Sequence, residues 1–196
     1  MSLLFLACTT EPPPPPPRVE IAVPMSLSRD PVPSGAIDVA VAGDDLLYVD
    51  GREVSDLLLR HSAPVALRVD SAVRYASLFL IVERLGNRPV SLIVAGGSGP
   101  AAIPLASPQL QSEGLELLVL MSPEAFIARA AERSENFPGH DHPGLRTWLT
   151  ELKADHPDSH RATLMPHDQV TTGELVQLAD TVRAAGFQTL VLSQAL

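Results

Sequence analysis

The stretch VALRVDSAVRYASLFLIVERLGNRPVSLIV, residues 65–94, decides the fold of this chain. Val65, Leu67 and Val69 alternate with smaller or charged residues, a period of two that is typical of a half-buried strand. An apolar stripe with helical spacing follows, and an apolar run over 90–94 comes after it. The stretch therefore predicts a strand, a helix and a second strand. The residues of the helical stripe are Leu78, Ile81, Val82 and Leu85.

The same plan returns 97 positions further along, in LMPHDQVTTGELVQLADTVRAAGFQTLVL, residues 164–192. Without any gap, Leu67 matches Leu164 and Val94 matches Val191. Any two amphipathic helices share a stripe by chance, but the flanking strands and the equal spacing favour a duplicated small domain. The second stripe consists of Leu175, Leu178, Ala179 and Val182.

Each copy is preceded by further elements that match. Val23–Ser26 resembles Ile103–Ala106, and each of these leading segments stands before an alternating strand. In the first half, 37–41 and 46–49 predict a hairpin, and the second half has a strand at 115–120. Both halves then carry an apolar helical stripe, formed by Val54, Leu57, Leu58 and His61 in the first and by Leu145, Trp148, Leu149 and Leu152 in the second. We interpret Trp148 as a core residue; a place in a binding groove is the alternative.

Composition limits the classes of function. The chain has 196 residues and a net charge of −9, which argues against a surface for nucleic acid or anionic membranes. No apolar stretch approaches the ~20 residues needed to span a bilayer. Aromatic residues make up only 4% of the chain, so Leu, Val, Ala and Ile must fill its core. The single cysteine excludes an internal disulfide.

The N-terminal residues 1–18 predict a lipid anchor followed by a spacer. The apolar start ends in Leu6-Ala7-Cys8, as a bacterial lipoprotein signal does, and Cys8 would be the lipidated residue. The run is shorter than usual and has no basic start, which a start codon placed too far downstream would explain. An ordinary N-terminal tail is the alternative. Pro12–Pro17 must form polyproline II, a stiff spacer of about 20 Å.

Residues that could carry chemistry are few. His140 and His142, with His156 and His160, are the one group resembling metal ligands, but both pairs fall in predicted loops, 136–144 and 155–160. The glycine-rich stretch 96–100 lacks the lysine of a phosphate loop, and we interpret it as a linker between domains. Asp70 can accept backbone N–H groups at the start of a helix, which His167 at the matching position cannot do in the same way. The sequence points to no catalytic, cofactor-binding or metal-binding residue.

Residues 19–96 resemble the periplasmic part of the ExbD/TolR biopolymer-transport family. The matching features are VEIAVPMS, the hairpin IDVAVAGDDLLYVDGREV and the unit LRVDSAVRYASLFLIVERL; in the second half HDQVTTGELVQLADTVRAAGFQTLVLS is equally close. The resemblance implies the family's periplasmic fold and a place in the bacterial envelope. It also implies proteins or peptidoglycan as partners, the proteins being a proton-channel-type or TonB-like component. The family's transmembrane helix, with its proton-linked carboxylate, has no counterpart here.

We therefore expect an α/β (α+β) chain of two tandem domains, 19–97 and 98–196, each a mixed sheet with two helices on one face. The two domains would pair within one chain, as family members are thought to pair between chains. The expected function is non-enzymatic: an accessory or scaffolding binding module for an envelope transport complex or the cell wall, tethered to the membrane through Cys8. The alternative is a metal-dependent binder or enzyme that uses the His-rich loops of the second half.

Overall fold

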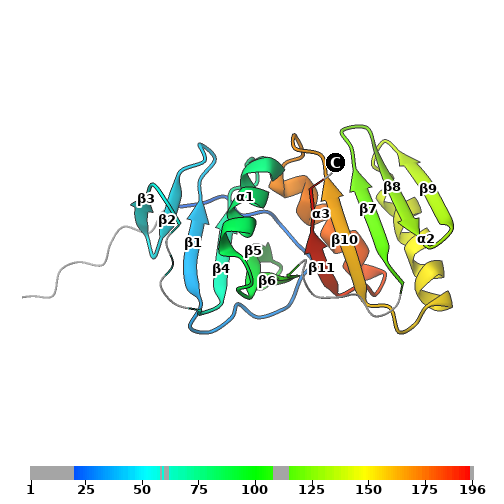
Figure 1. Ribbon diagram of the computed structural model, residues 1–196, viewed down its shortest axis with the longest axis horizontal. Coiled ribbons are helices and arrows are strands. Elements are labelled where there is room, and N and C mark those ends of the chain that lie inside the picture. Colours follow the sequence, from blue (N-terminus) through cyan, green and yellow to red (C-terminus); the bar gives the residue numbers. More distant parts are fainter. Residues whose placement is uncertain (1–19, 58, 60–61, 108–114, 195–196) are drawn as a thin grey trace, which may run out of the picture.

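The computed structural model describes residues 20–57, 59, 62–107 and 115–194. The predicted lipidation site Cys8 and the proline run lie outside the described residues. The described chain folds into a mixed α+β structure built on one continuous sheet (Figure 1). The order of its eleven strands is β3-β2-β1-β4-β5-β6-β11-β10-β7-β8-β9.

The elements have the following bounds. The strands are β1 (Ile37–Val41), β2 (Leu47–Val49), β3 (Arg52–Val54), β4 (Val65–Val69), β5 (Val90–Gly96), β6 (Gly99–Ala106), β7 (Leu117–Met121), β8 (Ala125–Ala130), β9 (Arg133–Pro138), β10 (Arg161–Pro166) and β11 (Thr189–Leu192). The helices of the described residues are α1 (Tyr75–Leu85), α2 (His142–Asp155) and α3 (Thr172–Ala184).

The strand–helix–strand units predicted from the sequence are confirmed. In the first half they are β4, α1 and β5, and in the second half β10, α3 and β11. The hairpin of β1 and β2 and the strand β7 also lie where they were expected. In α2 the buried residues are Leu145, Trp148, Leu149 and Leu152, so the predicted stripe faces the core and Trp148 belongs to it.

Two expectations about the first half are wrong. Val54 ends strand β3, and the described residues 55–57 form no helix, so the described part of the first half has one helix where two were expected. Leu58 and His61 lie outside the described residues. The glycine-rich stretch 96–100 is not a linker, because Gly96 pairs with Gly99 at the tip of the antiparallel β5–β6 hairpin. Strand β6 also pairs with β11, so the sheet passes without a break from one half to the other, and the two-domain arrangement is not confirmed.

The two halves are nevertheless related by an approximate twofold arrangement. The strand order β3-β2-β1-β4-β5 of the first half corresponds to β9-β8-β7-β10-β11 in the second. The backbone N–H of Tyr75 donates to the Val170 carbonyl (2.7 Å), and that of Thr172 donates to the Val73 carbonyl (2.8 Å). Each donor and acceptor of one bond lies 97 positions from its counterpart in the other bond. The starts of α1 and α3 therefore meet reciprocally around the Arg74–Thr171 bridge.

The gap-free match fails in the last strand. Leu67 pairs with Leu92 in β4–β5, whereas Leu164 pairs with Leu192 in β10–β11. The equivalent positions of the last strands are thus 100 residues apart, and Val94 does not match Val191. The second half therefore has additional residues between the start of its helix and its last strand. Part of this difference lies in the helices, because α3 has 13 residues and α1 has 11.

One apolar core joins the halves. A single cluster of buried residues contains side chains of all three helices and of strands from both halves, including the fully buried Tyr75, Phe126 and Phe187. The Tyr75 hydroxyl of α1 donates to the carbonyl of Ser193, the residue directly after β11 (2.7 Å). The cluster therefore crosses the midline of the sheet and packs the two halves against each other.

Residues 24–30, called the strap below, form an extended segment before β1. The strap lies beside Ala95 of β5 and Ala102 of β6, so it crosses the tip of their hairpin. Its middle is held by α3, which belongs to the second half. The strap therefore adds a second connection between the halves.

Candidate binding groove

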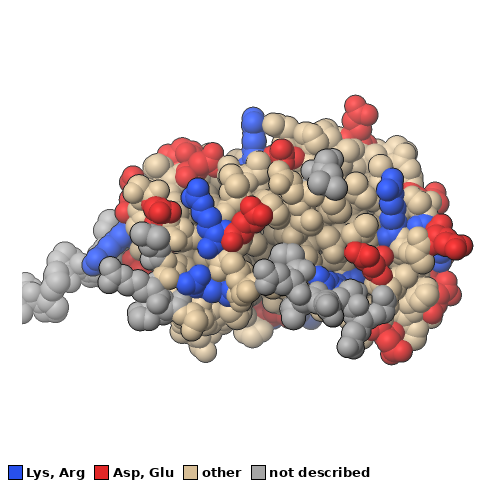
Figure 2. Space-filling model, viewed as in Figure 1, with Lys and Arg blue, Asp and Glu red and all other residues tan. Residues whose placement is uncertain are grey.

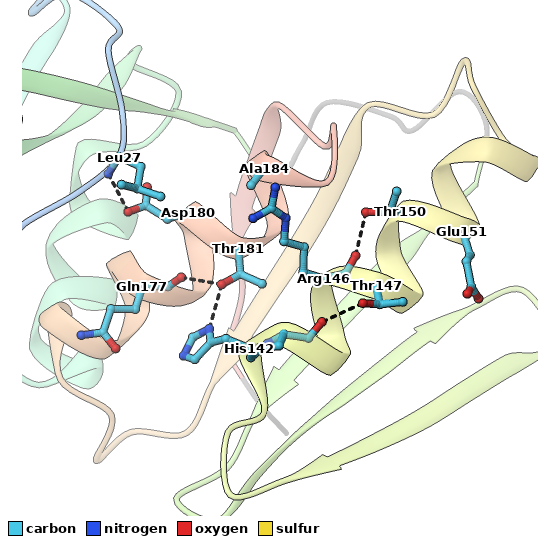
Figure 3. A pocket seen from close by; sticks show the side chains of 11 residues that line it. Leu27, His142, Arg146, Thr147, Thr150, Glu151, Gln177, Asp180, Thr181 and Ala184 are labelled. Carbon is cyan, nitrogen blue, oxygen red and sulfur yellow. Dashed lines mark hydrogen bonds between the residues drawn. The ribbon is translucent and has the colours of Figure 1, made fainter.

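A groove of about 800 Å³ lies on the outer side of α2 and α3 (Figure 3). Helix α2 lines one side of it, helix α3 the other, and Leu27 of the strap stands at its rim. No second helix stands beside α1 in the described part of the first half, so we find no counterpart of this groove there. The lining residues are Leu27, His142, Pro143, Arg146, Thr147, Thr150, Glu151, Gln177, Asp180, Thr181 and Ala184.

Helical periodicity creates the two walls. The buried stripes of α2 and α3 face the sheet, so the residues between them on each helix turn outward. On α2 the outward set includes Thr147 and Thr150, and on α3 it includes Ala184, all small side chains. Asp141 caps α2 by accepting the backbone N–H of Gly144 (3.0 Å), and Pro143 occupies the first turn. A capping box between Thr171 and Glu174 starts α3.

His142 fixes the distance between the walls at one end of the groove. Its Nδ1 lies 2.7 Å from the Thr181 hydroxyl, which itself donates to the Gln177 carbonyl (2.9 Å). This contact links the side chains of α2 and α3 directly. The His142 ring also meets the buried Phe126 edge-on. Burial lowers the pKa of His142 below its ordinary value; nearby His140 lowers it further, while Asp141 opposes the shift.

Asp180 fixes the strap against α3. Its carboxylate accepts the Ser26 hydroxyl (2.7 Å) at one oxygen and the backbone N–H of Leu27 (2.8 Å) at the other. One turn later, Arg183 donates to the Ser28 hydroxyl (3.0 Å) and to the Asp30 carboxylate (2.5 Å). These four bonds attach the strap along its length and set which of its side chains point inward.

The strap has the reverse of the usual polarity. Ser26 and Ser28 are buried, with exposures of 7% and 8%, whereas Met25 and Leu27 are exposed at 71% and 79%. In an extended segment neighbouring side chains point to opposite sides, so a shift of one residue would bury the apolar pair instead. Asp180 and Arg183 oppose that shift, because their partners are the serines. Leu27 is thereby held outward at the groove (Figure 3).

Two charged side chains of α2 flank the groove. Arg146 and Glu151 are exposed and form no side-chain hydrogen bond or ion pair within the described part of the chain. They are five residues apart, which is about 7.5 Å along the helix axis. The groove can therefore offer a positive and a negative group in addition to apolar contacts.

The histidines of the second half do not come together. His140 Nε2 bonds the Ser122 carbonyl (2.8 Å) and its ring stacks on Phe126, while His142 begins α2. His156 ends the same helix, and His160 Nδ1 lies 3.0 Å from the Lys153 ammonium group. The two pairs thus lie at opposite ends of a 14-residue helix. The described residues contain no group of three side chains placed to hold a metal.

The loop predicted over 136–144 is also wrong. Residues up to Pro138 belong to strand β9, and His142 is already in α2, so only a tight turn separates the two elements. Proline and glycine are typical of loops, but here Pro138 ends an edge strand and Pro143 starts a helix, two positions where proline is tolerated.

Asp70 and His167 behave alike, contrary to expectation. The Asp70 carboxylate accepts the backbone N–H of Ala72 (2.9 Å), and His167 Nδ1 accepts that of Gln169 (3.3 Å). Both stand in a turn ahead of the helix, whose N-caps are Arg74 and Thr171. A neutral imidazole nitrogen is an acceptor like a carboxylate oxygen, so the two residue types serve the same turn. Neither residue lines the groove.

Sequence reasoning missed the groove residues. The one available signal was the segment Met25-Ser26-Leu27-Ser28, whose strict alternation of apolar and polar residues predicts one buried face but cannot say which. The choice depends on Asp180 and Arg183, more than 150 residues away.

Comparisons with known proteins identify no relative: no protein-family model matches the chain, and neither the curated proteins nor the solved structures contain a match. Within the described residues, no helix is both long enough and apolar enough to cross a membrane.

Proposed function

We propose that this chain is a non-enzymatic binding module of the bacterial cell envelope, accessory to a transport complex or to the cell wall. The observation that carries this proposal is the groove between α2 and α3, with an outward apolar residue and two unpaired charges at its edges. A concave surface with a few polar groups is the usual form of a binding site. The residues of the groove can bind a partner through apolar and charged contacts.

The relationship to the ExbD/TolR family is part of the same proposal. It rests on the motifs of residues 19–96 and on the second copy of the plan. The reciprocal bonds between Val73–Tyr75 and Val170–Thr172 support it further, because a twofold interface joins identical positions of two copies. In this proposal the chain arose by duplication and is a dimer built into one polypeptide.

The proposed setting is the periplasmic side of a membrane. Lipidation at Cys8 would anchor the chain, and the proline run would hold the folded part away from the lipid surface. The proposed partners are envelope proteins, of the proton-channel or TonB-like kind, or peptidoglycan.

The test is a recovery experiment from envelope fractions with the intact chain. We expect specific partners with the native chain, weaker recovery with Cys8→Ser because the anchor is lost, and no recovery with Thr147→Trp, which fills the groove. Leu80→Trp, on the exposed side of α1, is the matched control and should behave as the native chain does. Equal recovery with Thr147→Trp and Leu80→Trp would show that the groove is not the binding site.

A further inference from the structure

The strap exposes two large apolar side chains, Met25 and Leu27, and Leu27 lies at the rim of the groove. Met25 and Leu27 have the highest exposures among the large apolar residues that the structure describes as exposed. Their outward orientation is enforced because Ser26, which lies between them, donates to Asp180, and Ser28, which follows Leu27, accepts from Arg183. Because specific hydrogen bonds hold this apolar pair exposed, we interpret the surface as a binding surface.

We propose that the α2–α3 groove takes an amphipathic helix of a protein partner, with Leu27 packed against the apolar face of that helix. This inference rests on the proposed function, since it names the occupant of the same groove. In this arrangement Arg146 faces an acidic residue of the partner and Glu151 faces a basic one.

The shape of the groove favours a helix. Its walls are outward faces of two helices, and the lining on α2 extends from His142 to Glu151, about 14 Å or two and a half helical turns. Helices pack into such valleys at 8–10 Å between axes, closest where the side chains are small. Thr147, Thr150 and Ala184 provide small side chains along these walls. A partner helix would then use apolar residues spaced three and four apart, the usual pattern of helix-in-groove recognition.

The charge distribution argues against the main competitor, a membrane surface. A bilayer is flat and would not fill a groove of about 800 Å³. The chain also carries a net charge of −9, which opposes approach to anionic lipid. Figure 2 has the view of Figure 1, in which strands of the second half stand in front of α2 and α3, and on that face basic side chains are scattered among acidic ones.

The test uses the full chain and synthetic peptides of about five helical turns, titrated by NMR or fluorescence anisotropy. The first peptide has leucines at helical spacing with a glutamate and a lysine flanking the stripe. The second has the same composition in scrambled order, and the third has a central proline. We expect the first to bind with chemical-shift changes at Leu27, Thr147 and Ala184, and the other two to bind about tenfold more weakly or not at all.

Variants locate the contact. Leu27→Ser is expected to weaken binding of the first peptide by about tenfold or more, whereas the matched control Leu80→Ser leaves it unchanged. Arg146→Glu should weaken binding of the peptide with glutamate facing it and favour one with lysine there. Melting curves followed through Trp148 verify that each variant is folded.

The outcomes separate this inference from the proposed function. Three results would overturn the proposal that an amphipathic helix occupies the groove: equal binding of all three peptides, no binding of any of them, or no effect of Leu27→Ser. So does Leu27-dependent binding to phosphatidylethanolamine–phosphatidylglycerol vesicles without peptide binding, which would assign the surface to lipid. If the peptides fail while Thr147→Trp still abolishes recovery from envelope fractions, the groove remains a binding site and only its occupant changes.

Discussion

At the scale of single residues, a few contacts that involve no apolar burial fix the position of the strap. Asp180 accepts from Ser26 and Leu27, and Gly96 leaves room for the strap to cross the β5–β6 hairpin. A Cβ at position 96 would lie 3.1 Å from the Ser28 carbonyl oxygen, from the Gly99 carbonyl oxygen and from the Ala101 Cβ. A side chain at residue 96 would therefore crowd the strap and the hairpin tip.

Replacing this glycine should loosen the strap. We expect Gly96→Val to lower the free energy of unfolding by about 1–3 kcal/mol, because two of the crowded neighbours are backbone oxygens that cannot turn away. A Cβ on the neighbouring Gly97 would meet no atom within 4 Å, so Gly97→Ala is the control and should change stability by less than about 0.5 kcal/mol. Urea unfolding followed by Trp148 fluorescence measures both. Equal effects of the two substitutions would contradict the close packing of the strap over residue 96.

Removing the carboxylate of Asp180 should free the register of the strap. We expect Asp180→Ala to destabilise the chain by about 1–3 kcal/mol, since two hydrogen bonds to a charged group are lost. Hydrogen exchange should accelerate at the Leu27 amide, which has lost its acceptor, and not at the Thr172 amide, which bonds Val73 outside the strap. Unchanged protection of Leu27 would show that Asp180 does not hold the strap.

At the scale of elements, α1 and α3 have the same position but different starts. Thr171 caps α3 through the Glu174 backbone N–H (3.3 Å), and the Glu174 carboxylate returns a bond to the Thr171 backbone (2.8 Å). The equivalent N-cap of α1, Arg74, has no side-chain capping bond. The backbone bond from Thr171 lowers the pKa of Glu174, so the stability that this carboxylate contributes is present above its ordinary pKa and is lost as the pH falls below it.

The two caps provide a matched pair of substitutions. Thr171→Ala is expected to lower stability by about 1 kcal/mol, because one orphan N–H of α3 loses its acceptor. Arg74→Ala, at the equivalent position of α1, has no such bond to lose and should change stability by less than about 0.5 kcal/mol. Thermal melting with circular dichroism compares them. A larger loss of stability from Arg74→Ala than from Thr171→Ala would refute the assignment of Thr171 as the stabilising N-cap.

The helix pair α2–α3 should be sensitive to pH through His142. Its lowered pKa means that the unfolded chain takes up a proton at a higher pH than the folded chain does. Stability is therefore complete above the ordinary histidine pKa of about 6.5 and falls as the pH drops below that value. We expect His142→Gln to flatten the fall in melting temperature between about pH 7.5 and pH 5.5. The control is His156→Gln, at the exposed end of α2, which should keep the native slope.

Most of the elements were predictable from the sequence, and the failures have physical causes. The stripes of α1, α2 and α3 have the period of 3.6, and β1, β4 and β7 alternate, so local pattern was sufficient. The stripe over 54–61 was misleading because Val54 pairs with Leu47 in a short strand, a tertiary preference that overrides periodicity. The glycine-rich stretch 96–100 is misinterpreted as a linker from its sequence, since a hairpin turn and a linker have the same composition.

The groove could not be predicted in the same way. Its lining residues are the outward positions of two helices, where sequence pattern carries almost no information. Leu27 belongs to the site only because Asp180 and Arg183 hold the serines of the strap inward. The twofold relationship was visible as a repeat, but the reciprocal bonds at Arg74 and Thr171 required the fold.

At the scale of the whole molecule, the sheet and the core both run across the boundary between the halves. Strand β6 pairs over seven residues with β5 and over two with β11, and the core cluster contains residues of α1, α2 and α3. Tyr75, which is completely buried, reaches from α1 to Ser193, the residue directly after β11. A half that unfolded alone would expose this shared surface on the other half.

This continuity predicts one cooperative unfolding transition. The single tryptophan, Trp148, reports on α2 in the second half alone, whereas far-ultraviolet circular dichroism reports on both halves. In a two-state transition the two signals change at the same denaturant concentration. Two independent domains would instead give a circular dichroism curve with a second step that tryptophan fluorescence does not follow. We expect coincident curves in urea, and we expect Tyr75→Phe to shift both curves together, because the lost bond to Ser193 joins the two halves. If Tyr75→Phe moved only the circular dichroism curve, the halves would be separate folding units, and the pairing around Arg74 and Thr171 would be a docking contact between domains.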